Sequence, residues 1–142
     1  METELLHLYC DGGARGNPGP AAIGVVISVI SQTGQSKPLA AFGKKIGETT
    51  NNVAEYQAVI AGLTFLKQRQ ERSKKIVVHL DSQLVAQQLS RKFKITKPHL
   101  KVLADQVFAL SREVAEQIIF QPIPRAQNQQ ADLLVNQALD NL

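Results

Sequence analysis

The sequence predicts an α/β fold with a mixed sheet of five strands that is flanked by helices. Three apolar, β-branched segments come first, and segments of helical period then alternate with two more apolar segments. The chain has 142 residues, of which 44% are hydrophobic, so it is long enough to bury one core. We therefore expect residues 1–142 to form a single domain.

The first three strands are expected to form an antiparallel meander. Residues 5–10 are apolar, residues 21–30 are apolar and β-branched, and residues 39–46 form a third strand at the edge of the sheet. A turn rich in glycine and proline, residues 12–20, separates the first two strands, and residues 33–36 connect the next two. Such short connections favour antiparallel neighbours.

The second half of the chain alternates helices with strands. Apolar residues recur at intervals of three and four over residues 52–69, which predicts a helix. Strands are expected at residues 76–80 and 118–123. Further helices are expected at residues 84–89, from Pro98 to Val114, and after Asn128, which is a plausible N-cap. Helical crossovers place the two later strands parallel to the first, in the strand order 3-2-1-4-5.

Acidic residues stand near the ends of these elements: Asp11, Glu55, Asp81 and Asp132. Asp11 and Asp81 follow strands that should be parallel neighbours, at the sheet edge where ligand sites of open α/β sheets form. Glu55 and Asp132 lie near the starts of helices that can point at this edge. Converging carboxylates repel each other unless cations neutralise them, and oxygen ligands select Mg²⁺ or Mn²⁺. The pattern predicts a metal site suited to cutting a phosphodiester.

The motifs around these acids resemble ribonuclease H type 1 over nearly the whole chain, from Tyr9 to about Ala138. An Asp-Gly-Gly-x-x-Gly-Asn-Pro-Gly turn begins at Asp11, and an Asn-Asn-x-x-Glu motif ends at Glu55. An Asp-Ser-Gln motif begins at Asp81, and an Asn-x-x-x-Asp motif ends at Asp132. Each motif alone is weak, but their common order at the element boundaries is specific.

The resemblance implies a ribonuclease H-like fold and an endonuclease that cleaves the RNA strand of RNA–DNA hybrids, leaving 5′-phosphate and 3′-hydroxyl ends. It also implies two Mg²⁺ ions, with Mn²⁺ as a possible substitute. Asp11 would bridge the ions, Glu55 and Asp81 would complete the sphere of one, and Asp132 would bind the other. Two cations about 4 Å apart clamp the attacking water and the leaving oxygen of an in-line displacement.

The resemblance further implies contacts to the hybrid. Gly12 and Gly13 let the backbone approach the ribose, whose 2′-hydroxyl distinguishes RNA from DNA. Their amides would bind hydroxyls and base edges in the minor groove, together with Asn17, Asn51, Asn52 and Gln83. Thr50, with Asn51, would hold a phosphate of the DNA strand.

Two features of better-studied family members are missing. The loop before the last aspartate carries a Gly-His pair in those proteins, whereas residues 121–128 contain no histidine. Arg125 is the nearest polar candidate; it stays charged and cannot shuttle a proton, but it can steady a phosphate or the leaving group. A basic protrusion that carries tryptophan is also absent, and the chain has no Trp. The chain therefore looks like a compact subgroup of the family.

Simpler structural roles also fit several of these residues. Asp11 can cap a turn, Asp132 can favour a helix N-terminus through the helix dipole, and Asn52 can cap its helix. Gly12 and Gly13 can simply shape a connection.

Other polar and charged groups are expected to be structural or to lie on the surface. His7 and His79 are expected to be packed or partly exposed strand residues, and Cys10 a small core residue. The densest basic stretch, from Arg91 to Lys101, is either a solvated surface or a contact to the DNA backbone.

Two other functions remain open: a non-catalytic module that binds hybrids on the same fold, and a different nuclease such as a resolvase or integrase core. The Gly12-Gly13 and Asn51-Asn52 pairs favour the ribonuclease over the latter. A net charge of +4 fits a polyanionic partner.

No apolar run reaches the roughly 18 residues of a membrane span, and the acidic N-terminus lacks the features of a signal peptide. We expect a cytoplasmic monomer without membrane partners. The chain has one cysteine, so an intramolecular disulfide is excluded.

Overall fold

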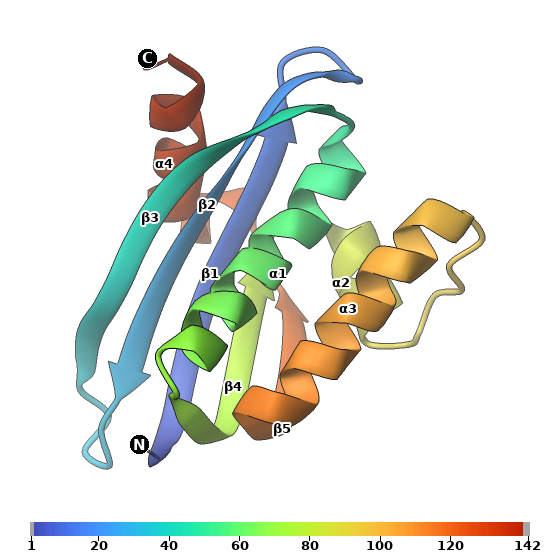
Figure 1. Ribbon diagram of the computed structural model, residues 1–142. Coiled ribbons are helices and arrows are strands. Elements are labelled where there is room, and N and C mark those ends of the chain that lie inside the picture. The colour runs from blue at the N-terminus through green and yellow to red at the C-terminus, as the bar shows by residue number, and fades with distance from the viewer. Residues whose placement is uncertain (1, 141–142) are drawn as a thin grey trace.

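The computed structural model describes residues 2–140, and their strands form one mixed sheet in the order β3-β2-β1-β4-β5 (Figure 1). Strands β1, β2 and β3 pair antiparallel, whereas β4 pairs parallel to both β1 and β5. The predicted strand order and directions are confirmed. The strands are β1 (Glu2–Ala14), β2 (Gly19–Ile30), β3 (Ser36–Thr49), β4 (Arg72–Leu80) and β5 (Ala115–Pro122).

Helices cover the two faces of the sheet unequally. Helices α1 and α3 lie side by side over one face, and α4 packs on the opposite face against β2 and β3 (Figure 1). The short helix α2 lies beside β5. The helices are α1 (Asn51–Gln68), α2 (Gln83–Leu89), α3 (Pro98–Val114), the 3₁₀ turn η1 (Arg125–Gln127) and α4 (Gln129–Asp140).

The hydrophobic core lies between the sheet and helices α1 and α3. Alternate residues of β1 and β4 point to this side, because side chains alternate between the faces of a strand. Leu6, Leu8 and Cys10 of β1 are fully buried there, as are Ile76 and Val78 of β4. Full burial of one such leucine or valine side chain contributes about 1.5–3 kcal/mol. The prediction that Cys10 is a core residue is confirmed.

Strand β1 runs further than the sequence indicated, and this changes the predicted place of Asp11. Residues 11–14 pair with residues 21–24 of β2, so the predicted turn at residues 12–20 shortens to residues 15–18. Pairing with β4 stops earlier, at Cys10 opposite Leu80. Asp11 therefore lies within β1, at the point where the neighbouring parallel strand has ended and one edge of β1 becomes open.

Close backbone contacts fix α4 against the sheet. A Cβ atom added at Gly24 of β2 would lie 2.2 Å from the Ala131 carbonyl oxygen, and one at Gly43 of β3 would lie 2.6 Å from the Leu134 oxygen. Only glycine allows this approach, which sets the position of the first turn of α4, where Asp132 lies.

The N-cap of α1 differs from the one considered. The Thr50 hydroxyl accepts a hydrogen bond from the Val53 amide, so Thr50 and not Asn52 caps this helix.

Among residues 2–140, no helix combines the length and the apolar character that crossing a bilayer requires.

Candidate active site

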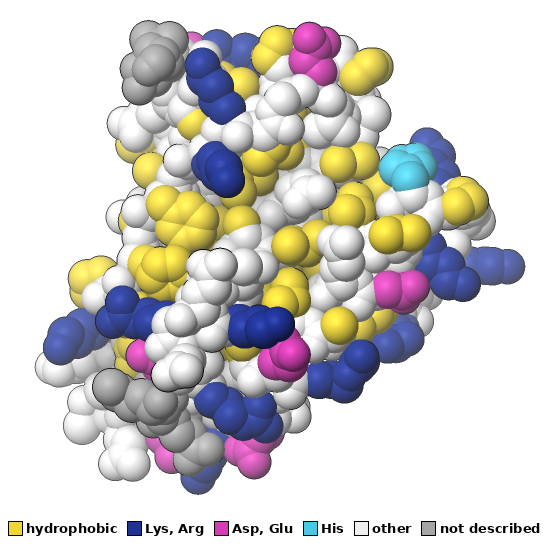
Figure 2. Space-filling model, in the orientation of Figure 1, with side chains coloured by type: hydrophobic (Ala, Val, Ile, Leu, Met, Phe, Trp, Pro, Cys, Tyr) yellow, Lys and Arg dark blue, Asp and Glu magenta, His cyan; other side chains and the backbone are white. Residues whose placement is uncertain are grey.

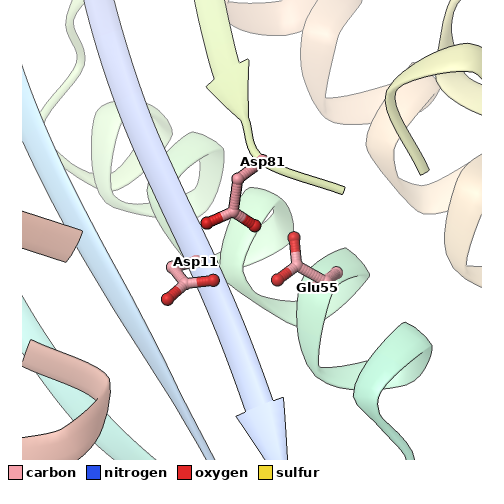
Figure 3. A group of neighbouring side chains, drawn as sticks. All are labelled: Asp11, Glu55 and Asp81. Carbon is pink, nitrogen blue, oxygen red and sulfur yellow. The ribbon is translucent and has the colours of Figure 1, made fainter. Parts of the chain in front are cut away.

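Three carboxylates from three different elements meet at the end of β4 (Figure 3). Asp11 belongs to β1, Glu55 to the second turn of α1, and Asp81 directly follows the last residue of β4. Each offers one oxygen atom, and these three atoms all lie within 4.8 Å of one another. The predicted convergence of these side chains is therefore present in the fold.

Gly12 brings α1 close enough to β1 for Glu55 to reach the cluster. The Gly12 amide donates a hydrogen bond to Glu55 Oε1 at 2.9 Å. A Cβ atom at Gly12 would lie 2.2 Å from both the carbonyl carbon and the oxygen of Ala54. No side chain fits there, so this glycine is needed for the contact between helix and strand. The structural role considered for Gly12 is thus present.

Burial and mutual repulsion both oppose ionisation in this cluster. Asp11 and Glu55 are buried, being 7% and 5% exposed. The pKa of Asp11 is raised to about 7, chiefly by burial; a hydrogen bond with Glu55 opposes the shift, and the charges of Asp81 and Asp132 add to it. Burial, followed by the charge of Asp11, raises the pKa of Glu55 well above its usual value.

No ion pair among the described residues includes Asp11, Glu55 or Asp81. Ion pairs within residues 2–140 involve other acids, namely Glu4, Glu71, Glu113 and Asp140. Among the described residues, the buried Glu55 Oε2 atom has no hydrogen-bond partner. A buried carboxylate oxygen without a partner carries a free-energy cost that a bound cation removes. These residues therefore fit a divalent cation that prefers oxygen ligands, such as Mg²⁺ or Mn²⁺.

Asp132 lies beside this cluster but is not part of the group within 4.8 Å. It is half-buried in the first turn of α4, and it lines a groove of about 410 Å³ together with the other three acids. Its charge and a hydrogen bond raise the pKa of Asp11, so the two side chains sense each other directly. Asn136 Nδ2 lies 3.4 Å from Asp132 Oδ2 and donates to it.

The same groove contains five of the residues predicted to contact substrate: Gly12, Gly13, Asn51, Asn52 and Arg125. Gly13 differs from Gly12, because a Cβ atom there would meet only Val135 at 3.8 Å. Asn51 Oδ1 accepts a hydrogen bond from the Ala14 amide at 2.8 Å, which ties the start of α1 to β1. These five residues thus lie around the carboxylates in the same groove.

The three other predicted contacts, Asn17, Thr50 and Gln83, do not line this groove, and each takes part in a local hydrogen bond. Asn17 Oδ1 accepts from the Asn51 amide at 2.9 Å, and the Thr50 hydroxyl caps α1. Gln83 Oε1 accepts from Gln87 Nε2 at 3.4 Å within α2. Asn17 and Thr50 therefore shape the backbone around Asn51.

Asn128 has a positioning role that its local sequence does not reveal. Its side-chain amide donates to the Cys10 carbonyl at 2.9 Å and lies 3.5 Å from Asp81 Oδ2. The expected capping bond is absent, since among the described residues the buried Asn128 Oδ1 has no partner. Asn128 instead joins the start of α4 to β1 and to Asp81. Asn136 was also missed, although its spacing of four residues from Asp132 places both on one helix face.

The two strand histidines, each expected to be a packed or partly exposed strand residue, lie against each other. His79 Nε2 lies 3.0 Å from His7 Nδ1, and the His79 ring stacks on Tyr9 with 4.3 Å between centroids. Burial, together with His7, lowers the pKa of His79 to about 4. The His79 imidazole is therefore neutral at pH 7 and does not offset the carboxylate charges.

The chain matches the family described as "Reverse transcriptase-like" over residues 9–138. It is 41% identical over 94% of its length to the bifunctional protein Rv2228c of Mycobacterium tuberculosis, but it spans only 35% of that relative. The chain therefore covers about a third of the first relatives that it matches. It is 30% identical over its full length to ribonuclease H of Coxiella burnetii, of which it covers 94%.

Solved structures with the same fold include close relatives of the chain. RNase H1 from the halophilic archaeon Halobacterium salinarum superposes with a TM-score of 0.88 at 37% identity, covering 97% of this chain and 99% of that one. LC11-RNase H1, solved in complex with an RNA/DNA hybrid, has a TM-score of 0.85 at 40% identity, covering 95% of this chain and 96% of that one.

Proposed function

Because the chain belongs to the type 1 ribonuclease H family, we propose that it is an endoribonuclease acting on the RNA strand of RNA–DNA hybrids. Cleavage would leave 5′-phosphate and 3′-hydroxyl ends. The observation that carries the proposal is the meeting of Asp11, Glu55 and Asp81 oxygens within 4.8 Å in a groove open to solvent. The hybrid bound to LC11-RNase H1 supports the class of substrate.

We propose that these carboxylates hold Mg²⁺, with Mn²⁺ as a substitute. Asp11 would contact both of two ions; Glu55 and Asp81 would complete the sphere of one, and Asp132 that of the other. When bound, two divalent cations activate water and stabilise the charge on the leaving oxygen. Glu55 Oε2 supports this assignment, since it is a buried acceptor without a hydrogen-bond partner among the described residues and could bind an ion.

The groove residues would orient the hybrid. The Gly13 backbone is open on its outer side, so it can approach a ribose, whereas Gly12 is covered by α1 and its amide is used by Glu55. Asn52 would reach the minor groove of the hybrid, because it lines the groove of the protein and Thr50, not Asn52, caps α1. Asn51, Asn17 and Thr50 would act together, since hydrogen bonds fix the loop that they form.

Arg125 would take the place of the missing histidine in position but not in chemistry. It is exposed in η1 and lines the groove that holds the four acids. A guanidinium holds its proton at neutral pH, so it would bind a phosphate oxygen by charge-assisted hydrogen bonds. We propose that Arg125 steadies the scissile phosphate or the leaving 3′-oxygen, while the attacking water loses its proton to solvent and solvent protonates the leaving oxygen.

An assay with three labelled duplexes tests the proposal. End-labelled RNA–DNA hybrid, double-stranded RNA and double-stranded DNA are incubated with the protein, with and without Mg²⁺. We expect cleavage of the hybrid's RNA strand only, and only with metal. Preferential cleavage of DNA would indicate another nuclease, and binding of the hybrid without cleavage at any metal concentration would indicate a non-catalytic module.

We also propose that the protein acts as a monomer and that residues 1–142 form one domain. One core joins the sheet to α1 and α3, and one groove collects all four acids. Light scattering of the protein with and without hybrid tests the oligomeric state, and a dimer mass would contradict the proposal.

A further inference from the structure

Strand β5 leaves one edge of the sheet without a neighbouring strand. β5 pairs only with β4 among the described residues. The Ile123 amide donates to the Leu80 carbonyl on the β4 side, whereas the Phe120 carbonyl accepts from the Ser90 hydroxyl on the outer side. Peptide groups alternate along a strand, so Ile118 and Phe120 direct theirs outward. Within residues 2–140, the Ser90 hydroxyl is the group that bonds this outward edge, so the edge at Ile118 is open to another chain.

A groove lies along this edge. It has a volume of about 590 Å³ and is bounded by the end of α2, by α3 and by β5. Consecutive β5 residues line it, from Ile118 to Pro122, although their side chains point to opposite faces of the sheet. The groove therefore follows the strand edge itself, and we call it the β5-edge groove.

The β5-edge groove combines an apolar floor with a basic rim. Its apolar side chains are Leu89, Phe108, Ile118, Ile119 and Phe120. Its charged side chains are Arg91, Lys92 and Arg112, and none of the described residues that line it is acidic. Lys and Arg side chains also gather over the α3 side of the surface in Figure 2. A ligand that fits must offer apolar groups, negative charge and backbone hydrogen bonds together.

We propose that the β5-edge groove binds an extended acidic segment of a partner protein, which joins the sheet beside β5. An added strand satisfies the outward peptide groups, and its alternate side chains enter the groove. Apolar side chains would contact Ile118 and Phe108, and Asp or Glu side chains would pair with Arg112 and Lys92. Exposed edges with apolar neighbours promote aggregation unless they are covered, so a natural partner also protects this edge.

Two other occupants fit the groove less well. A single-stranded nucleic acid would need exposed rings for stacking, but the Arg91 guanidinium covers the Phe108 ring at 4.0 Å from its centroid. A second copy of the chain pairing β5 with β5 would bring two basic rims together, and like charges at an interface oppose association. Backbone pairing and charge both favour an acidic peptide.

Selection from a displayed library of random peptides, each about eight residues long and so within the usual length of a strand, tests this inference with the 142-residue chain as bait. We expect enrichment of peptides that alternate apolar residues with Asp or Glu. The selected peptide is then synthesised, and its affinity is measured for the protein and for two charge-reversal variants. Arg112→Glu should weaken binding by about tenfold or more. Lys37→Glu carries the same charge change on the opposite edge strand, β3, and should bind normally.

Hydrogen exchange provides the readout that separates strand addition from simple charge attraction. We expect the bound peptide to protect the Ile118 amide, which points outward, and to leave Ile119, already bonded to β4, unchanged. Two versions of the peptide are then compared, each N-methylated on one of the two alternating sets of amides. The version whose methylated amides point at β5 cannot donate to the edge and should lose binding, whereas the other should keep it. These readouts do not depend on whether a variant folds.

Several outcomes would overturn the inference. Enrichment of basic peptides or of none, equal affinity of the Arg112→Glu variant, or exchange protection on both alternating sets of β5 amides would each contradict it. Peptide binding that single-stranded DNA displaces from this groove would assign the site to nucleic acid. A dimer that Arg112→Glu stabilises would assign it to a second copy.

Discussion

The two faces of strands β1 and β4 serve opposite purposes. On the side of α1 and α3, Leu8 and Val78 are fully buried in an apolar core. On the other side, His79 is half-buried, and both strands lead into carboxylates, Asp11 and Asp81. One face gains free energy from removing apolar surface from water, whereas the other leads to the site, where Glu55 of α1 joins these like charges and the repulsion lowers the stability of the metal-free fold.

The difference teaches how a small domain holds an unfavourable site. Asp11 is flanked in sequence by Cys10, which is fully buried, and by Gly12, which α1 covers. These two neighbours fix the backbone on both sides of the carboxylate, so it cannot relax away from Glu55 and Asp81. The core face therefore supplies the rigidity that the site face requires, and changes on the two faces should have different consequences.

The largest effect is expected for Asp11→Asn, which acts on the site face alone. Loss of a shared metal ligand should reduce hybrid cleavage by about a thousandfold or more, since metal ions supply several kcal/mol of transition-state stabilisation. The metal-free variant should be at least as stable as the parent, because a buried charge is gone. Activity and thermal denaturation are measured together, with Asp105→Asn, an exposed acid of α3, as the control. Normal cleavage by Asp11→Asn would break the comparison.

On the core face, Leu8→Ala should lower the free energy of unfolding by about 2–5 kcal/mol, because it leaves a cavity in the core. Leu8 is fully buried, whereas Val102 of α3 is 58% exposed. Val102→Ala, the control, should change stability by no more than about 0.5 kcal/mol. Urea denaturation measures both. The folded fraction of Leu8→Ala should keep its activity, and a specific loss of cleavage without destabilisation would show that the faces are not separate.

The pH dependence of stability should reveal the cost of the site face. Folding raises the pKa of Asp11 from 3.8 to about 7, so in this window the folded state binds more protons than the unfolded state. The free energy of unfolding of the metal-free protein should therefore fall as pH rises from 3.8 towards 7. Denaturation in a chelator at a series of pH values measures this, and Asp11→Asn should flatten the profile.

Adding Mg²⁺ should reverse this loss above the raised pKa, where the carboxylates are ionised and bind metal. A ligand that binds only the folded state raises stability by about 2.7 kcal/mol at a concentration of 100 times its Kd. Calorimetry at millimolar Mg²⁺ measures the shift. A metal-free profile that rises through the window, or the absence of any shift with metal, would contradict a preformed repulsive cluster.

The smallest effect should come from comparing neighbouring glycines. Gly12→Ala places a methyl group 2.2 Å from Ala54 backbone atoms, so α1 must shift and carry Glu55 with it. We expect a loss of about 1–3 kcal/mol together with reduced cleavage. Gly13→Ala meets only Val135 at 3.8 Å and should fold normally. Equal stability of the two variants would show that α1 is not held by this close approach.

The sequence was sufficient to predict the strand order, the main helices and the convergence of Asp11, Glu55 and Asp81, whereas Asp132, expected to join them, lies beside this group in the same groove. Periodicity marks the elements, and acids next to strand ends mark the site. The sequence does not show which residue caps α1, because Thr50, Asn51 and Asn52 are adjacent and each is of a type that caps helices. The glycine-rich segment after Asp11 also concealed the extension of β1, since its pairing with β2 depends on tertiary contacts.

The role of Asn128 lay beyond the sequence for a different reason. Its side-chain amide bonds Cys10, which is 118 residues away in the chain. Local pattern favoured a cap, because an asparagine preceded an apolar helical stripe. Only the folded arrangement of β1, β4 and α4 brings this amide to Asp81.

Anomalous diffraction from crystals soaked in Mn²⁺ tests the central claim most directly. The account predicts a metal peak bonded to oxygens of Asp11, Glu55 and Asp81, and its loss in Asp11→Asn crystals prepared in the same way. An empty groove at saturating Mn²⁺, or a peak held only by other residues, would contradict it.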